Sequence, residues 1–191
     1  MSKNFTLILV IVFLVGMLSG ALIPKASAQT RNFHLYGSAS LGWGFASNSI
    51  TSPGPSIQVY QGETVNLTLT SQDGLAHQFF VDYNNNSVAD SGEPSSVTFT
   101  GTITYSFIAD TLGNFKYRCT FHPTVMLGNL KVTIPGDING DGIVDISDAA
   151  LIGVNWQKTV PPAPVLADFN GDGIIDISDA AIVGIHWQQL A

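Results

Sequence analysis

Short runs of alternating apolar and polar residues dominate the chain between residues 56 and 134. The run ETVNLTLTS places Val65, Leu67 and Leu69 on one face, as in a half-buried β-strand. The runs SSVTFTGTITYSFIA, NFKYRC and NLKVTI continue the pattern, with Gly, Asn and Pro residues between them. This pattern predicts a mainly β fold, an antiparallel β-sandwich of about 100 residues. Residues 29–55 are expected to supply its first strand and a loop.

The pattern changes after Gly136. DINGDGIVDISDAALIGVNWQ at 137–157 recurs 31 residues later as DFNGDGIIDISDAAIVGIHWQ at 168–188, with fifteen of the twenty-one positions identical. Each copy has an Asp-rich stretch and then an apolar segment that predicts a short helix, capped by Asp148 or Asp179. We therefore expect a small C-terminal α module of two loop-helix repeats.

The N-terminus has the pattern of a secretory signal peptide. Lys3 precedes an uncharged apolar run over residues 5–23, and the small residues ASA end the segment at Ala28. We expect cleavage after Ala28; an uncleaved membrane anchor is the alternative, because the run approaches the ~20 residues that span a bilayer. The predicted domains are a signal peptide at 1–28, the sandwich domain at 29–135 and the C-terminal domain at 136–191.

Acidity is concentrated in the C-terminal domain. The whole chain carries 7 Lys+Arg and 14 Asp+Glu, for a net charge of −7. Residues 136–191 contain eight Asp and one Lys, which alone give −7. A protein this acidic is not expected to bind nucleic acid, and membrane contact is expected only if the N-terminal segment stays uncleaved. The local acidity requires its own explanation.

The chain has a single cysteine, in the stretch RCTFHPTVM. An exported protein with one cysteine has no internal disulfide, so the thiol is an inert buried group, an intermolecular bridge or a metal ligand. Cys119-x2-His122-x3-Met126, with His77 upstream in GLAHQFF, supplies one thiolate, two imidazoles and one thioether. This set is typical of a mononuclear blue-copper electron-transfer site. Zinc is disfavoured because a thioether is a poor zinc ligand.

Residues 29–134 resemble a cupredoxin of the plastocyanin and pseudoazurin type, through DGLAHQFF and YRCTFHPTVM. The resemblance implies a Greek-key sandwich and one copper ion held by His77, Cys119, His122 and Met126. It also implies electron exchange with a redox partner protein that the sequence does not name. The His-to-Met spacing is one residue shorter than in plastocyanins and one longer than in amicyanins, so the pattern departs from the family at Met126.

A copper enzyme is the competing class, and it would need further histidines for a second metal centre. Only His34 and His186 remain, and His186 aligns with Asn155 in the other repeat. We therefore expect electron transfer by one mononuclear copper, and no enzymatic activity. Two alternatives stay open. The same ligands could serve copper delivery, or the chain could be a structural or interaction protein whose sandwich is a copper-free spacer.

Each C-terminal repeat fits the calcium-loop pattern D-x-N-x-D-G-x-x-D-x-x-D, with Gly142 and Gly173 at the sharp turn. Oxygen ligands at alternate positions wrap a hard cation of the size of Ca²⁺. The predicted ligands are Asp137, Asn139, Asp141, the Ile143 carbonyl, Asp145 and Asp148 for the first calcium, and Asp168, Asn170, Asp172, the Ile174 carbonyl, Asp176 and Asp179 for the second.

No helix is expected before either loop, which distinguishes the repeats from EF-hands. Two loop-helix units at this spacing, after the main domain of an exported protein, resemble a dockerin over residues 136–191. The resemblance implies a cohesin-like partner domain recognised by Ile146, Ser147, Ile177 and Ser178. The repeat helices are apolar nearly all round, so either a partner covers them or they pack on their own chain.

A third stretch, DYNNNSVADSGE at 82–93, also has calcium-loop spacing, with Ser87 where glycine is usual. The alternative is an ordinary polar loop, glycosylated at Asn85. A calcium here would lie about 16 Å along the chain from His77 and would leave copper little affected. Its ligands would be Asp82, Asn84, Asn86, the Val88 carbonyl, Asp90 and Glu93.

The predicted function joins the two modules. We expect a secreted or extracellular surface-associated blue-copper protein that transfers single electrons. A calcium-dependent dockerin-like module would tether it to a partner or a surface assembly. The expected cofactors are one copper ion and two calcium ions, with the 82–93 loop as a third calcium site.

Overall fold

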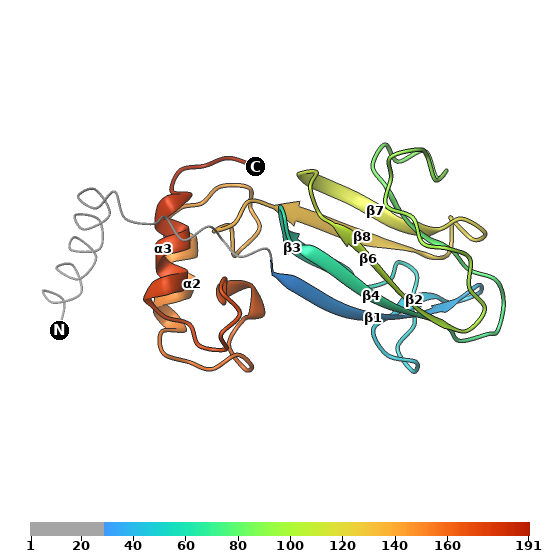
Figure 1. Ribbon diagram of the computed structural model, residues 1–191, viewed down its shortest axis with the longest axis horizontal. Helices are drawn as coiled ribbons and strands as arrows, with labels where there is room; N and C mark the ends of the chain where they lie inside the picture. The colour runs from blue at the N-terminus through green and yellow to red at the C-terminus, as the bar shows by residue number, and fades with distance from the viewer. Residues whose placement is uncertain (1–28) are drawn as a thin grey trace, which may run out of the picture. The chain divides into compact units, whose positions relative to one another are not determined.

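The computed structural model describes residues 29–191, and the chain divides into two compact units between Thr133 and Ile134. The predicted signal segment lies outside the described residues. Figure 1 labels strands of the N-terminal unit and the two helices of the C-terminal unit. In the described part of the chain, no helix is long and apolar enough to cross a membrane.

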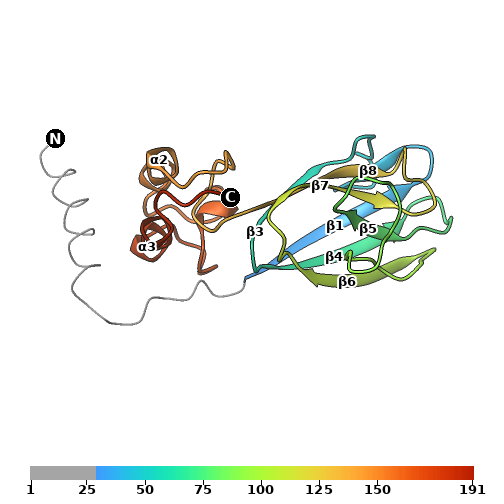
Figure 2. The same ribbon diagram turned by 90° about the horizontal axis from the view of Figure 1, so that it is seen from above.

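The N-terminal unit is a sandwich of two four-stranded sheets, which Figure 2 shows facing each other. The fold class predicted from the sequence, a mainly β sandwich with a small C-terminal α module, is confirmed. The first sheet has the order β2 (Gly42–Gly44), β1 (Thr30–Ser38), β4 (Thr64–Ser71) and β6 (Thr102–Ile108). The second has the order β3 (Ser56–Tyr60), β8 (Leu127–Thr133), β7 (Gly113–Cys119) and β5 (Phe79–Asp82).

Two strand pairs run parallel, where the sequence pattern led us to expect antiparallel pairing. β1 pairs with β4 and β3 pairs with β8 in parallel register, and the other pairs are antiparallel. Side chains alternate with period two in both kinds of strand pair, so the alternation does not reveal the direction. Each parallel pair joins strands that are distant in the sequence, as a sandwich with crossover connections requires.

The predicted inward faces of the strands form the core. Val65, Leu67 and Leu69 of β4 are at most 1% exposed. They belong to one apolar cluster with residues of the opposite sheet, among them Val59, Phe79, Tyr117 and Val132. Full burial of such side chains contributes roughly 1.5–3 kcal/mol each. The cluster therefore fixes the frame that carries the loops at the sandwich ends.

The C-terminal unit contains helices α2 (Ile146–Val154) and α3 (Ile177–Ile185), with the short 3-10 turn η1 (Val165–Ala167) between them. The prediction that Asp148 and Asp179 are the helix N-caps is wrong. The caps are Asp145 and Asp176, whose side chains accept a hydrogen bond from the backbone N–H two residues later. Asp148 and Asp179 instead complete a capping box, because they accept from the backbone N–H of the cap residue.

Candidate metal centres

Three candidate copper ligands come together in the N-terminal unit. Sγ of Cys119 lies 3.7 Å from Nδ1 of His77 and 3.8 Å from Nδ1 of His122. The three ligand atoms lie within 4.8 Å of one another. His77 precedes β5 and forms an isolated β-bridge with Phe99, whereas Cys119 is the last residue of β7. The fold therefore joins residues that are 42 positions apart in the sequence.

The turn between β7 and β8 positions Cys119, His122 and Met126. The amide of His122 donates to the Cys119 carbonyl at 3.2 Å, and the amide of Met126 donates to the His122 carbonyl at 2.8 Å. The amide of Cys119 donates back to the Met126 carbonyl at 2.9 Å. Gly37 makes room for Met126, because a Cβ there would lie 2.7 Å from its methyl carbon. Met126 is thus brought back beside Cys119 at the closed end of the turn.

The cluster is closed on the inside of the protein and reaches the surface through His122. His77, Cys119 and Met126 are 0% exposed. His122 is partly exposed, and its neighbour Phe121 is 52% exposed. One thiol, two imidazole nitrogens and a buried thioether fit copper by their chemistry. Close packing around them restricts rearrangement of the ligands between oxidation states.

Hydrogen bonds within the cluster shift the pKa of two ligands in the metal-free protein. Burial alone would raise the pKa of the Cys119 thiol, but the His77 ring and nearby backbone amides lower it below its ordinary value. Burial alone would lower the pKa of His77, but hydrogen bonds to Cys119 and Asp73 raise it. Lowering the pKa of Cys119 favours the thiolate, which is the form that binds metal ions.

Asp73 is a partner of His77 that sequence reasoning missed. Its Oδ1 lies 2.9 Å from Nε2 of His77, the ring nitrogen that faces away from Cys119. Burial alone would raise the pKa of Asp73, but the amide of Ala39 and the His77 ring, among other hydrogen bonds, lower it. The only sequence signal is an acidic residue four positions before a predicted ligand.

Backbone amides hold the predicted calcium ligands of the C-terminal loops in place. In the first loop, Asp137 at position 1 accepts from the amides of positions 5 and 6, at 3.0 and 3.1 Å. Asp148 at position 12 accepts from the amides of positions 2 and 9, at 2.7 and 3.0 Å. In the second loop, Asp168 accepts from the amide of position 6, and Asp179 accepts from the amides of positions 2 and 9. Both loops are therefore wrapped with their carboxylates fixed.

The carboxylates of these loops repel one another without a cation. Burial, first, and the charges of neighbouring carboxylates raise the pKa of Asp137 and of Asp179, although backbone amides partly oppose the shift. Gly142 and Gly173, at position 6, adopt φ values of 95° and 86° that favour glycine. The loops thus combine a calcium-type turn with a local excess of negative charge that a divalent ion would relieve.

The 82–93 loop has the hydrogen-bond pattern of the first C-terminal loop at positions 1, 3, 5 and 12. In both, position 1 accepts from amides 5 and 6, position 3 from amide 5, position 5 from amide 7, and position 12 from amides 2 and 9. Ser87, at position 6, adopts a φ of 66°, in the same left-handed region as Gly142. The loop therefore has the same turn as the first C-terminal loop despite the missing glycine.

Arg118 connects the 82–93 loop to the copper-ligand turn. Its Nε donates to Asp82 at 2.7 Å, its Nη2 to the Asn85 side chain at 2.8 Å, and its Nη1 to the Pro123 carbonyl at 2.8 Å. Arg118 is only 8% exposed, although the alternation of β7 places it on the polar face. The two candidate metal sites therefore share a buried cation, which the sequence-based estimate of their separation did not foresee.

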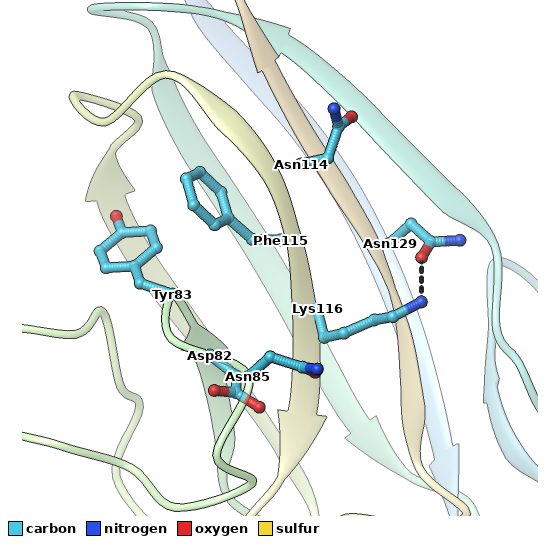
Figure 3. A pocket seen from close by; sticks show the side chains of 7 residues that line it. All are labelled: Asp82, Tyr83, Asn85, Asn114, Phe115, Lys116 and Asn129. Carbon is cyan, nitrogen blue, oxygen red and sulfur yellow. Dashed lines mark hydrogen bonds between the residues drawn. The ribbon is translucent and has the colours of Figure 1, made fainter.

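A cavity of about 300 Å³ lies between the 82–93 loop, β7 and β8. Figure 3 shows the Lys116 side chain extending from β7 to Asn129 on the paired strand β8, with Nζ 2.6 Å from Oδ1. Asp82 is the only predicted ligand at this cavity, so we assign the cavity no part in metal binding. The lining residues are Asp82, Tyr83, Asn85, Asn114, Phe115, Lys116 and Asn129.

The predicted partner-binding residues lie in the first turn of each repeat helix. Ile146 is 61% exposed and Ile177 is 49% exposed, and the serine that follows each is also exposed. The exposed apolar side chains farther along the unit include Val154, Trp156, Ile185 and Leu190. These exposed apolar side chains are candidate contacts for a partner.

Comparisons with known proteins match the two units separately. Residues 135–186 match the family of the dockerin type I domain. The comparison with curated protein sequences found no match. Auracyanin A, a "blue" copper protein from the bacterium Chloroflexus aurantiacus, is 18% identical over 54% of this chain and 98% of its own, with a TM-score of 0.43.

Two further solved structures have similar values. Rusticyanin from Thiobacillus ferrooxidans is 14% identical over 65% of this chain and 93% of its own, with a TM-score of 0.42. A multi-copper oxidase from Pseudomonas thermotolerans is 16% identical over 56% of this chain and 30% of its own, with a TM-score of 0.39. The family match confirms the dockerin-like resemblance of the C-terminal domain.

Proposed function

We propose that this protein is a blue-copper electron-transfer protein that binds one copper ion through His77, Cys119, His122 and Met126. The observation that carries the proposal is the convergence of two imidazole Nδ1 atoms on the Cys119 sulfur, at 3.7 and 3.8 Å, in a buried cluster. A thiolate, two imidazoles and a weak thioether serve both oxidation states of copper. Copper bound there would supply a one-electron couple, and the protein a rigid, desolvated ligand set.

We infer electron transfer rather than catalysis because His34 and His186, the two remaining histidines, form hydrogen bonds outside the copper-ligand cluster. Within the described residues, His34 bonds to Thr70 at 2.9 Å, and His186 bonds to Gln189 at 2.7 Å in the other unit. Neither joins a second ligand cluster in that part of the chain. One mononuclear copper then favours single-electron exchange with a redox partner. The partly exposed His122 gives that partner the shortest approach to the metal.

Addition of Cu(II) to the purified full chain tests this function. We expect stoichiometric uptake, an intense visible thiolate-to-copper band and a mononuclear EPR signal. Cys119→Ser should abolish the band, whereas Met126→Leu should keep copper and change the reduction potential. His34→Gln is the matched control, because it removes an imidazole outside the cluster and should leave the band intact. Absence of stoichiometric copper uptake by the wild type would refute the proposal.

We propose that residues 136–191 bind two calcium ions and dock to a cohesin-like domain outside the cytoplasm. The dockerin family match, the preformed loops and the exposed Ile146 and Ile177 support this proposal. The calcium ligands are those predicted from the loop spacing. Docking would tether the copper domain to a partner or a surface assembly, while packing of the apolar helices on their own chain is the competing arrangement.

Calcium-dependent pull-down by a cohesin-like domain tests the docking proposal. Asp137→Ala with Asp168→Ala removes the position-1 ligand of both loops and should abolish capture without changing the copper spectrum. The matched control is Asp110→Ala, which removes an exposed carboxylate of the sandwich. If the loop variant also lost its copper colour, the two units would not act independently and packing on the same chain would be favoured.

We also propose a third calcium ion in the 82–93 loop, bound by the side chains of positions 1, 3, 5, 9 and 12 and the carbonyl of position 7. Support comes from hydrogen bonds that match those of the first C-terminal loop at positions 1, 3, 5 and 12. Calorimetry of the full chain should then give three ions. The Asp137→Ala, Asp168→Ala variant should retain one, and adding Asp90→Ala should remove it. Two ions in the wild type would leave residues 82–93 as a polar loop.

A further inference from the structure

His77 is held on both sides of its ring. Nδ1 faces the Cys119 sulfur at 3.7 Å, and Nε2 faces Asp73 Oδ1 at 2.9 Å. The rings of Trp43 and Phe99 pack beside it, with centroid distances of 6.3 and 5.9 Å. Because Nδ1 is the nitrogen directed at the metal position, the ring proton belongs on Nε2, where it is donated to the carboxylate.

Asp73 is itself fixed in the turn after β4. Its Oδ2 accepts from the amide of Ala39 at 2.7 Å, and its Oδ1 accepts from the amide of Leu75 at 3.1 Å and the hydroxyl of Ser71 at 3.2 Å. Its side chain is 24% exposed, so solvent screens the charge only in part. The carboxylate is therefore a fixed negative charge that points at the remote nitrogen of a predicted copper ligand.

We propose that Asp73 is a positioning residue that selects the His77 tautomer for copper and lowers the reduction potential of the site. A carboxylate that accepts the second ring N–H of a metal-bound histidine raises the basicity of the ligating nitrogen. A more basic ligand and a nearby negative charge both favour Cu(II) over Cu(I). This inference rests on the proposed copper function. If copper is held there, one electron from the redox partner protein would reduce Cu(II) to Cu(I), and the proton between Asp73 and His77 would stay in place.

The test compares the reduction potential of the wild type with that of Asp73→Asn, which keeps an acceptor oxygen but loses the charge. We expect the equilibrium to move toward Cu(I) by about tenfold, which is about 59 mV for a one-electron couple. Asp73→Glu, which keeps the carboxylate, should restore a potential near that of the wild type.

The matched control is Asp110→Asn, an exposed position with the same change in net charge. It follows β6 at the end where Ile108 pairs with Thr64, whereas Asp73 follows the opposite end of β4. About seven residues of strand separate the two ends, or roughly 23 Å, well beyond the ~8 Å Debye length. The control should therefore move the copper equilibrium by less than about twofold.

A second readout does not require copper. In the metal-free wild type, at a pH where the His77 ring is neutral, nitrogen NMR should place its proton on Nε2, and Asp73→Ala should populate both tautomers. Equal potentials in Asp73→Asn and Asp110→Asn would overturn the tuning role, and an unchanged tautomer in Asp73→Ala would overturn the positioning role. If the wild type binds no copper, the proposed function fails at that step, and the tautomer measurement still decides the role of Asp73.

Discussion

Arg118→Met should strongly destabilise the sandwich, because Arg118 is the buried cation between the 82–93 loop and the copper-ligand turn. The substitution keeps an apolar stem of similar length and removes all three hydrogen bonds of the guanidinium. It leaves the Asp82 carboxylate, whose side chain is 0% exposed, without a cation. Breaking one side of a buried ion pair costs about 3–5 kcal/mol.

We expect a loss of about 3 kcal/mol, the lower end of that range, because two backbone amides still donate to Asp82 at 3.0 Å. Lys116→Met is the matched control on the same strand. Lys116 is only half-buried and donates to a single amide oxygen, that of Asn129, so its loss should cost below about 1 kcal/mol. The double variant Asp82→Asn, Arg118→Met should lose at least about 1 kcal/mol less unfolding free energy than the sum of the two single losses.

Urea unfolding of the metal-free protein measures these free energies. Trp156 and Trp187 are replaced by Phe in every variant, so that the fluorescence of Trp43, which is 0% exposed, reports the sandwich. Linear extrapolation then gives the free energy of unfolding. If Arg118→Met cost no more than Lys116→Met, or if the double variant lost the sum of the single losses, the buried link would contribute nothing and the reasoning would be wrong.

Two further predictions concern packing and pH. A Cβ at Gly128 would collide with the Tyr117 ring, so Gly128→Ala should lower the free energy of thermal unfolding by roughly 1–3 kcal/mol. The control is Gly101→Ala, which should cost little because a Cβ there would have no atom within 4 Å. In chelator, the raised pKa values of Asp137 and Asp179 mean that these carboxyls contribute stability below the ordinary value of 3.8 and lose it as pH rises through their folded-state values. Helix content by circular dichroism should therefore fall as the pH rises above about 4 without metal, and excess calcium should reverse that trend. A pH-independent signal in chelator would contradict the shift.

Local patterns predicted the features that depend on neighbours in the sequence. Alternation identified the buried face of β4, and the short spacing from Cys119 to Met126 predicted a single turn that carries three ligands. The twelve-residue spacing of the calcium loops fixed which backbone amides face which carboxylates, because those contacts span only a few residues. The two helices followed from the apolar repeats.

Features that depend on which strands become neighbours were not predictable in this way. Arg118 lies on the polar face of β7 by alternation, and its burial results from Asp82 on the paired strand β5. Asp73 approaches His77 because the turn after β4 packs against the start of β5. The N-cap error arose because each repeat has two aspartates three residues apart, and only the closed loop decides which one starts the helix.

The spacing of the candidate copper ligands has a consequence for the order of folding events. Three of them lie within residues 119–126, so the unfolded chain can gather them at a small cost in loop entropy. His77 is 42 residues away from Cys119 and arrives only with β5. A metal that also binds the unfolded chain stabilises the native state by less than its native affinity implies. An unfolded chain would therefore bind copper through the three ligands of residues 119–126. Binding of the copper by His77 would be the step that links metal binding to folding.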